Sequence, residues 1–213
     1  MTLELARVIA FVSLMFFIGG VIYHYLSTKK LKFPADYARP KGSWKVGVFY
    51  SFTIGMLPWK KESTRRHWIA YLRGVMFHIG IFTGLFALIV SPFFKEMDKT
   101  FLLAVALLTG LGALMGYAGI VMRLVERNLR SISTPDDYIS VSFVSLFLTF
   151  LTLAILNEKF LTAMYLTSAV TLIYAPLGKI KHCIYFFFSR FFFGLHLGKR
   201  GIVHRFTEVS YGK

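Results

Sequence analysis

Six histidines carry most of the chemistry available to this sequence, because its apolar segments contain almost no Asp or Glu. A neutral imidazole is a common metal ligand, and an ionisable side chain at membrane depth is costly unless it serves a function. His78 lies about ten residues into a long apolar segment, and His182 lies near the cytoplasmic end of another. One histidine from each of two facing helices is the ligand set that a bis-imidazole haem b needs.

The residues four positions before these histidines fit the same interpretation. Gly74 precedes His78 by four residues, and Gly178 precedes His182 by four. Residues at this spacing share one face of a helix, so a glycine beside each ligand leaves room for a flat porphyrin. The alternative is that the histidines only hydrogen-bond a neighbouring helix and that the glycines serve helix packing. We favour ligation, because two histidines at matching depth show the same glycine spacing.

The other histidines are weaker candidates. His67 and His196 could pair on a second haem, but both follow Lys and Arg residues that belong at the membrane surface. We expect His67, His196, His24 and His204 to be surface residues.

Two arginines near the cytoplasmic ends of apolar segments are candidate partners for haem propionates, which need cations or hydrogen-bond donors. These are Arg73 and Arg123; the alternative is ordinary basic flanking of membrane spans. The glycines between residues 110 and 119 indicate close helix packing.

The elements that must position these residues are apolar helices. The chain has 213 residues, 56% of them hydrophobic and 16% charged, whereas a soluble domain carries about 25% charged residues. We therefore predict a single all-α integral membrane domain over residues 1–213. Five segments are long enough to span a bilayer; they are residues 8–26, 68–94, 100–122, 138–156 and 161–188. A single cysteine excludes an intrachain disulfide and an all-cysteine iron–sulfur cluster within this chain.

The basic residues predict the orientation of these spans. Of the 25 Lys and Arg residues, 21 fall on one side of the predicted membrane with six of the ten acids, so that side carries the whole net charge of +15. The positive-inside rule places this side in the cytoplasm, with the N-terminus outside and the C-terminus inside. The charge needs no nucleic acid to explain it; anionic lipid or an acidic cytoplasmic partner suffices. Two further segments, 43–57 and 183–197, are predicted to lie at the cytoplasmic interface; the alternative for 183–197 is that it extends the fifth helix.

Short motifs resemble the gamma subunit of respiratory nitrate reductase, a membrane cytochrome b. They are FHIGI at 77–81, YAPLGKIKH at 174–182 and the loop from Arg123 through RSISTPDDY. GMLPWKKES at 55–63 and the tail SRFFFGLHLGKRG look more like a sub-branch. Its members accompany heterodisulfide-reductase-like iron–sulfur proteins in sulfate-reducing and dissimilatory sulfite reductase-linked complexes. The resemblance implies haem ligation by His78 and His182.

The departures from this family are informative. The resembled subunit binds two haems, and the positions matching its outer ligands are here Leu88 and Met164. The resemblance therefore implies one haem b, on the cytoplasmic side, and puts the outer quinol site in doubt. It also implies a quinone, menaquinone, as mobile substrate, and a cytoplasmic iron–sulfur partner of the heterodisulfide-reductase or nitrate-reductase-beta type. The membrane would be the prokaryotic inner membrane.

The sequence thus predicts an electron-transfer subunit whose substrate chemistry belongs to partner chains. Three alternatives stay open. They are a cytochrome that binds a second haem through His67 and His196, a haem-free membrane anchor, and a transporter or channel. The scarcity of carboxylates in the spans argues against a transporter that couples to protons through Asp or Glu.

Overall fold

The structure is a computed structural model that describes residues 2–32, 37–60 and 66–203. Across these residues the ordered elements are helices, with no strand. The chain divides into two compact units, which are described separately below. The first unit comprises residues 1–23 and 69–181, and the second comprises residues 24–68 and 182–213. Residues 61–65 of the basic loop and His204, predicted to be a surface residue, lie outside the described residues.

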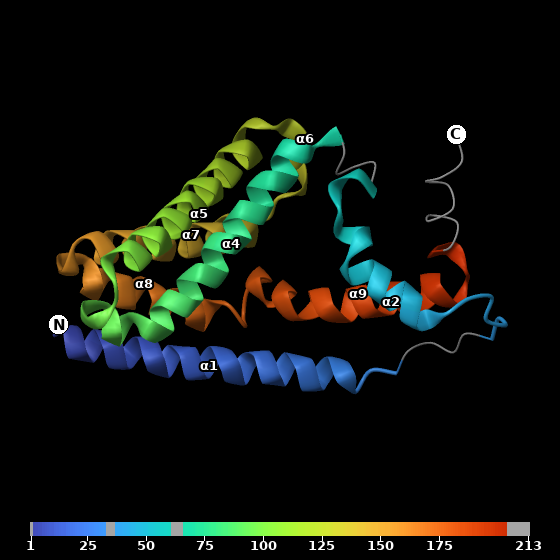
Figure 1. The fold of residues 1–213 in the computed structure, drawn as a ribbon, viewed down its shortest axis with the longest axis horizontal. Coiled ribbons are helices and arrows are strands. Elements are labelled where there is room, and N and C mark those ends of the chain that lie inside the picture. Colours follow the sequence, from blue (N-terminus) through green and yellow to red (C-terminus); the bar gives the residue numbers. More distant parts are fainter. Residues whose placement is uncertain (1, 33–36, 61–65, 204–213) are drawn as a thin grey trace. The chain divides into compact units, whose positions relative to one another are not determined.

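The first unit is a bundle of long helices joined by short 3₁₀ turns (Figure 1). Its helices are α1 (Leu3–Lys29, up to Tyr23 in this unit), α4 (Trp68–Val90), α5 (Lys99–Val125), α6 (Arg127–Ile132), α7 (Pro135–Leu156) and α8 (Leu161–Tyr174). Its 3₁₀ turns are η3 (Ser91–Glu96), η4 (Glu158–Phe160) and η5 (Lys179–Lys181). Four helical segments are long and apolar enough to cross a membrane, beginning at Leu3, Trp68, Lys99 and Pro135.

This arrangement confirms the all-helical prediction across the described residues. The first four predicted spans each fall within one helical segment. A fifth span exists only if Glu158–Tyr174 and Lys179–Lys199 together form one crossing. The count of five spans and the orientation across the membrane therefore stay predictions.

The predicted fifth segment, 161–188, is not one continuous helix. Helix α8 ends at Tyr174, and residues 175–178 form a turn before η5 and the next helix. Pro176 explains the break, because proline has no N–H to donate to the carbonyl of Leu172 and its ring clashes with that carbonyl. The N–H groups of Leu177 and Gly178 instead both donate to the Tyr174 carbonyl, at 3.0 and 2.9 Å.

Close contacts between α4, α5 and α7 depend on glycine. A Cβ on Gly80 of α4 would lie 2.6 Å from the Cα of Gly112 on α5, so the two backbones touch. Gly116 packs against the Phe77 ring and the Ser145 hydroxyl, and Gly84 packs against the Leu148 side chain. Small residues allow this close approach in membrane bundles, which have no hydrophobic driving force between helices. The predicted packing role of the α5 glycines is confirmed for Gly112 and Gly116.

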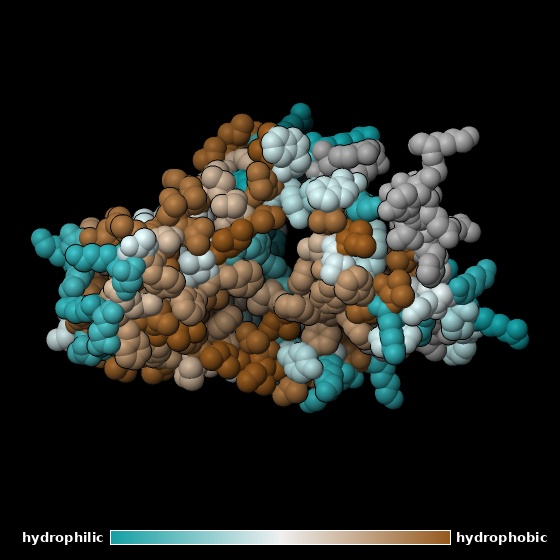
Figure 2. Space-filling model, in the orientation of Figure 1, coloured by the Kyte–Doolittle hydropathy of each residue, from teal (hydrophilic) through white to brown (hydrophobic). Residues whose placement is uncertain are grey.

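The core of the first unit is apolar, and a few hydroxyl pairs cross it. Leu148 and Leu151 of α7 and Tyr165 of α8 have no exposed surface. The Tyr165 hydroxyl lies 2.9 Å from the Ser91 hydroxyl, and the Thr109 hydroxyl of α5 lies 2.8 Å from that of Thr152 on α7. Such hydrogen bonds between helices satisfy polar groups that lipid cannot. The visible outer face of this unit is mostly hydrophobic, as expected for contact with lipid (Figure 2).

The second unit is built around two helices that pack closely, α2 (Trp44–Phe52) and α9 (His182–Lys199). It also contains η1 (Ile54–Met56), η2 (Pro58–Lys60) and the last residues of α1. The predicted interfacial segments 43–57 and 183–197 coincide closely with these helices. Their contact with each other was not predicted.

Candidate functional site

His78 is the eleventh residue of α4 and its side chain is exposed. Its Nδ1 lies 2.7 Å from the carbonyl oxygen of Gly74. A carbonyl oxygen only accepts hydrogen bonds, so in a neutral imidazole this bond places the proton on Nδ1 and the lone pair on Nε2. This second hydrogen bond is the arrangement that orients metal-binding histidines and fixes their tautomer.

Helix α4 has one buried face and one open face near His78. Phe77, Gly80 and Gly84 are buried on the face that packs against α5 and α7. Gly74 has open space beside it, because a Cβ built there would meet no atom within 4 Å. The surroundings of His78 and Gly74 therefore fit the approach of a large planar group from outside the first unit, and not from within its core.

Arg73 lies on a different face of α4 from His78. Five residues separate the two positions by roughly 140° around the helix axis. The guanidinium of Arg73 rests on Gly119 of α5, where no side chain competes for the space, and donates to the carbonyl of Met115 at 3.1 Å. Its Nε is buried and has no hydrogen-bond partner within the described part of the chain. Arg73 is thus anchored to α5.

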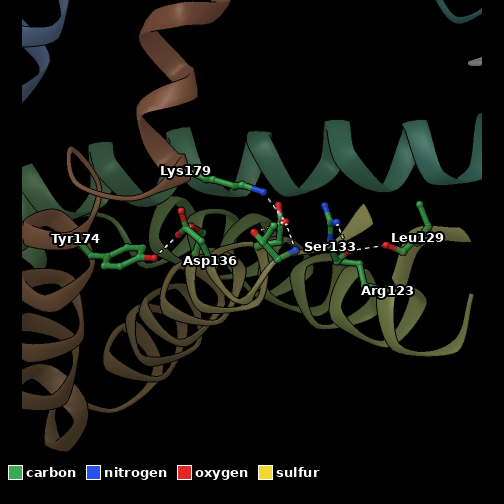
Figure 3. Close-up of polar contacts among 9 residues, drawn as sticks. Arg123, Leu129, Ser133, Asp136, Tyr174 and Lys179 are labelled. Atoms are coloured by element: carbon green, nitrogen blue, oxygen red, sulfur yellow. Dashed lines mark hydrogen bonds and ion pairs between the residues drawn. The ribbon is translucent and has the colours of Figure 1, made fainter. Parts of the chain in front are cut away.

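Arg123 lies close enough to Arg73 for the two positive charges to interact. The Arg123 guanidinium donates to the Ser133 hydroxyl at 2.9 Å, and that hydroxyl donates to the Leu129 carbonyl at 2.7 Å (Figure 3). The two predicted arginines therefore lie on α4 and α5 of the first unit, each with its own hydrogen-bond partner. Such a pair can hold an anionic group such as a carboxylate.

A second polar cluster links the start of α7 to the break after α8 (Figure 3). The Tyr174 hydroxyl donates to Asp136, and the Lys179 ammonium contacts Asp137 at 2.6 Å. Asp137 also accepts from the backbone N–H of Thr134 at 2.8 Å, which completes a capping box at the N-terminus of α7. These bonds fix the turn that leads to η5 and His182.

The sequence analysis assigned no individual role to these five residues. The capping box was readable from Thr134 and the acids that follow it. The long-range partners Tyr174 and Lys179 carry no local signal, because their contacts join residues about forty positions apart in the chain.

His182 is the first residue of α9 and its side chain is exposed. It belongs to the second unit, whereas His78 belongs to the first, so their pairing stays a prediction. The expectation that Gly178 shares a helix face with His182 is wrong, because Gly178 lies in the turn before η5. A Cβ on Gly178 would also collide with the Tyr174 ring, so its surroundings are filled.

The remaining described histidines all lie in the second unit. His196 is half-buried and its Nδ1 lies 2.9 Å from the Phe192 carbonyl, the same arrangement as in His78. The Nδ1 of His24 lies 3.1 Å from the Tyr185 hydroxyl. His67 is exposed. The surface assignment is therefore correct for His67, while His24 and His196 are partly covered.

Leu88 and Met164 lie inside the core of the first unit. Leu88 is 1% exposed and Met164 is 0% exposed, and both belong to one apolar cluster. The positions that correspond to the outer haem ligands of the resembled family are thus occupied by packed apolar side chains.

A cavity of about 830 Å³ lies at the end of the first unit where α1 and α5 begin. Its lining includes Ser91, Arg7 and Lys95. Ser91 follows His78 by 13 residues, which places the cavity roughly 20 Å further along the helix direction. The cavity is therefore separate from the surroundings of His78.

Within the described ranges no group of three or more His, Cys, Asp or Glu side chains converges as for a metal ion. Haem needs only two protein ligands, so this finding leaves that assignment open. Comparisons of the chain with known protein families, with curated proteins and with solved structures find no match. The resemblance to the nitrate reductase gamma subunit stays a prediction from short motifs.

Proposed function

We propose that this chain is a membrane cytochrome b subunit with one haem b, held by His78 and His182. It would pass electrons between a membrane quinone, menaquinone, and a cytoplasmic iron–sulfur protein. Five spans, an outside N-terminus and a prokaryotic inner membrane belong to the same proposal. When bound, haem b supplies one-electron redox chemistry.

The main support for the proposal is the hydrogen bond that orients the His78 ring. Its Nδ1–H donates to the Gly74 carbonyl, so the nitrogen with a lone pair is Nε2, as iron ligation requires. The open space at Gly74 supports the same assignment, because a porphyrin edge can approach the backbone there. His78 is exposed on the first unit, so a group outside that unit can reach it.

The proposal of a single haem is supported by the core of the first unit. Leu88 and Met164 are buried with other apolar side chains and offer no nitrogen ligand at the outer positions. Arg123 and Arg73 supply positive charge in the first unit and are the proposed partners of the propionates. Arg123 is the stronger of the two, because Arg73 is already anchored on Gly119 and Met115.

A second haem on His67 and His196 is the runner-up. It is favoured by one observation, the bond between His196 Nδ1 and the Phe192 carbonyl, which prepares that ring in the same way as His78.

Haem content tests these assignments directly. The protein purified from membranes should show the α and β bands of a low-spin cytochrome b and one haem per chain by pyridine haemochrome assay. His78→Ala and His182→Ala should each abolish the spectrum, because one imidazole cannot maintain bis-histidine ligation. His67→Ala and His196→Ala are the matched controls and should leave the haem content unchanged.

The other outcomes are equally clear. Two haems per chain, one of them lost in His196→Ala, would establish the two-haem cytochrome instead. Protein that folds and contains no haem after growth with ample haem would indicate a membrane anchor, and full haem content in His78→Ala would disprove the ligand assignment.

A further inference from the structure

The sequence of the second unit is strongly basic, with 15 Lys and Arg residues against three acids, Asp36, Glu62 and Glu208. Its described cations are Lys29, Lys30, Lys32, Arg39, Lys41, Lys45, Lys60, Arg66, Arg190, Lys199 and Arg200. Most of them are exposed. Balanced charges are the norm on soluble surfaces, so this excess of positive charge indicates an anionic partner.

The two main helices of this unit form a closely packed pair. Gly47 of α2 lies directly against Gly194 and Gly198 of α9, where any larger side chain would meet backbone. The Ser51 hydroxyl donates to the Arg190 carbonyl at 2.8 Å, and the Lys41 N–H donates to the Lys199 carbonyl at 2.7 Å. Phe52 of α2 also packs on the rings of Phe186 and Phe187 of α9, with ring centroids 6.3 and 6.2 Å apart.

Several exposed side chains of this unit are aromatic. On α2 and α9, Phe49 is 65% exposed and Phe187 is 62% exposed, and Trp44 and Phe193 are also exposed; Trp59 of the neighbouring turn η2 is 62% exposed. All three tryptophans of the chain, Trp44, Trp59 and Trp68, fall in this unit. Aromatic rings mixed with Lys and Arg are typical of the boundary between lipid headgroups and acyl chains.

Lipid satisfies both features together. Nucleic acid or an acidic protein surface would pair with the cations, but each would leave large aromatic side chains facing water unless it also supplied an apolar groove. An anionic bilayer surface offers phosphate groups beside acyl chains, and the chain already carries helices fit to cross a membrane.

We propose that α2 and α9 form a membrane-surface element that binds an anionic lipid leaflet, with their exposed aromatic rings at the headgroup level and their cations on lipid phosphates. This inference is independent of haem binding. It takes α9 as a surface helix and is therefore an alternative to the fifth span, which needs α9 to complete the crossing that begins with Glu158–Tyr174.

Tryptophan fluorescence can report whether this element contacts lipid. In a Trp68→Phe background, fluorescence comes only from Trp44 and Trp59, both exposed on the second unit. The full chain is reconstituted into vesicles of phosphatidylcholine, with or without phosphatidylglycerol, whose acyl chains carry bromine just below the headgroup. Bromine quenches tryptophan only at short range.

We expect quenching that increases with phosphatidylglycerol and decreases with added salt, because the cations contact lipid phosphate. Lys41→Gln, Lys45→Gln and Arg200→Gln each remove one exposed cation of the second unit. Each should lower the ratio of bound to unbound element about five-fold. The matched control is Lys95→Gln with Lys99→Gln in the first unit, which should leave the quenching unchanged.

Two results would overturn the inference. One is tryptophan emission that aqueous iodide quenches and brominated lipid does not, whatever the phosphatidylglycerol content. The other is protection of Trp44 and Trp59 that appears only when an acidic protein partner or a nucleic acid is added. Helix content measured by circular dichroism checks that each variant is folded.

Discussion

Glycines on α4 serve two opposite purposes. Gly80 lets the backbone of α5 come into contact, whereas Gly74 leaves its side of the helix empty. Gly74 also accepts the hydrogen bond from the His78 ring, so ring orientation and open space occur at one position. In the proposed haem site this combination fixes the ligand and admits a flat group beside it.

Gly74→Leu tests this role. A leucine there fills the open space without disturbing a helix contact, so we expect a large fall in haem content with unchanged helix content. Gly19→Leu on α1 is the matched control, because a Cβ at Gly19 also meets nothing within 4 Å. The measurement is haem per chain in protein purified from membranes. Equal haem content in both variants would show that Gly74 has no part in admitting the porphyrin.

The residue scale also shows where sequence reasoning ends. A helical location for His78 followed from the apolar segment around it, since periodicity and length are local signals. The position of Arg73 on Gly119 did not, because those residues are 46 positions apart and meet only after α4 and α5 pack. Gly178 was misplaced for a local reason, since the helix break at Pro176 was not given its full weight.

At the scale of elements, α5 joins two other helices of the first unit, α4 and α7. It contacts α4 through Gly112 and α7 through the hydroxyls of Thr109 and Thr152. At a glycine face the two helix backbones are in direct contact, so an added Cβ can be accommodated only if one helix moves away from the other. This makes the stability of the unit sensitive to single positions.

Gly112→Val should destabilise the first unit by about 1–3 kcal/mol, the usual cost of overpacking. A Cβ there would lie 2.8 Å from the Cα of Gly80, which cannot move alone. Gly110→Val on the same helix is the control, because its Cβ would meet only the Thr152 methyl at 3.4 Å. Unfolding temperatures in detergent should rank Gly112→Val well below Gly110→Val. Equal temperatures would argue against close contact between α4 and α5.

The pairing of α2 with α9 shows why the second unit was harder to predict. Each segment was recognisable alone as short, apolar and rich in aromatics. Their contact joins Gly47 to Gly194, far apart in the chain. Gly194 and Gly198 have the small-xxx-small spacing of a packing face, but that spacing does not identify the partner helix. Long-range pairing of this kind depends on shape complementarity, which a single sequence does not display.

At the scale of the whole molecule, charge is distributed unequally along the chain. The second unit holds 15 of the 25 Lys and Arg residues, whereas at the cavity end of the first unit Lys95 pairs with Glu158 at 3.1 Å and Arg7 with Glu4 at 3.2 Å. Segments rich in Lys and Arg stay on the cytoplasmic side during insertion, and Asp and Glu contribute little to that choice. This asymmetry is the physical basis of the proposed orientation.

Cys183 makes the orientation testable without engineering the basic loops. It is the only cysteine of the chain, it is exposed, and it lies at the start of α9 in the positively charged unit. A membrane-impermeant maleimide should therefore label it in inside-out vesicles and leave it unlabelled in intact cells. The reverse control is the double variant Cys183→Ser with Lys99→Cys. Intact cells should then be labelled, because Lys99 is the first residue of α5 and lies on the predicted outer side of the membrane. Labelling of native Cys183 in intact cells would place the basic side outside the membrane. A cytoplasmic iron–sulfur partner could not then dock on it, whatever the haem content.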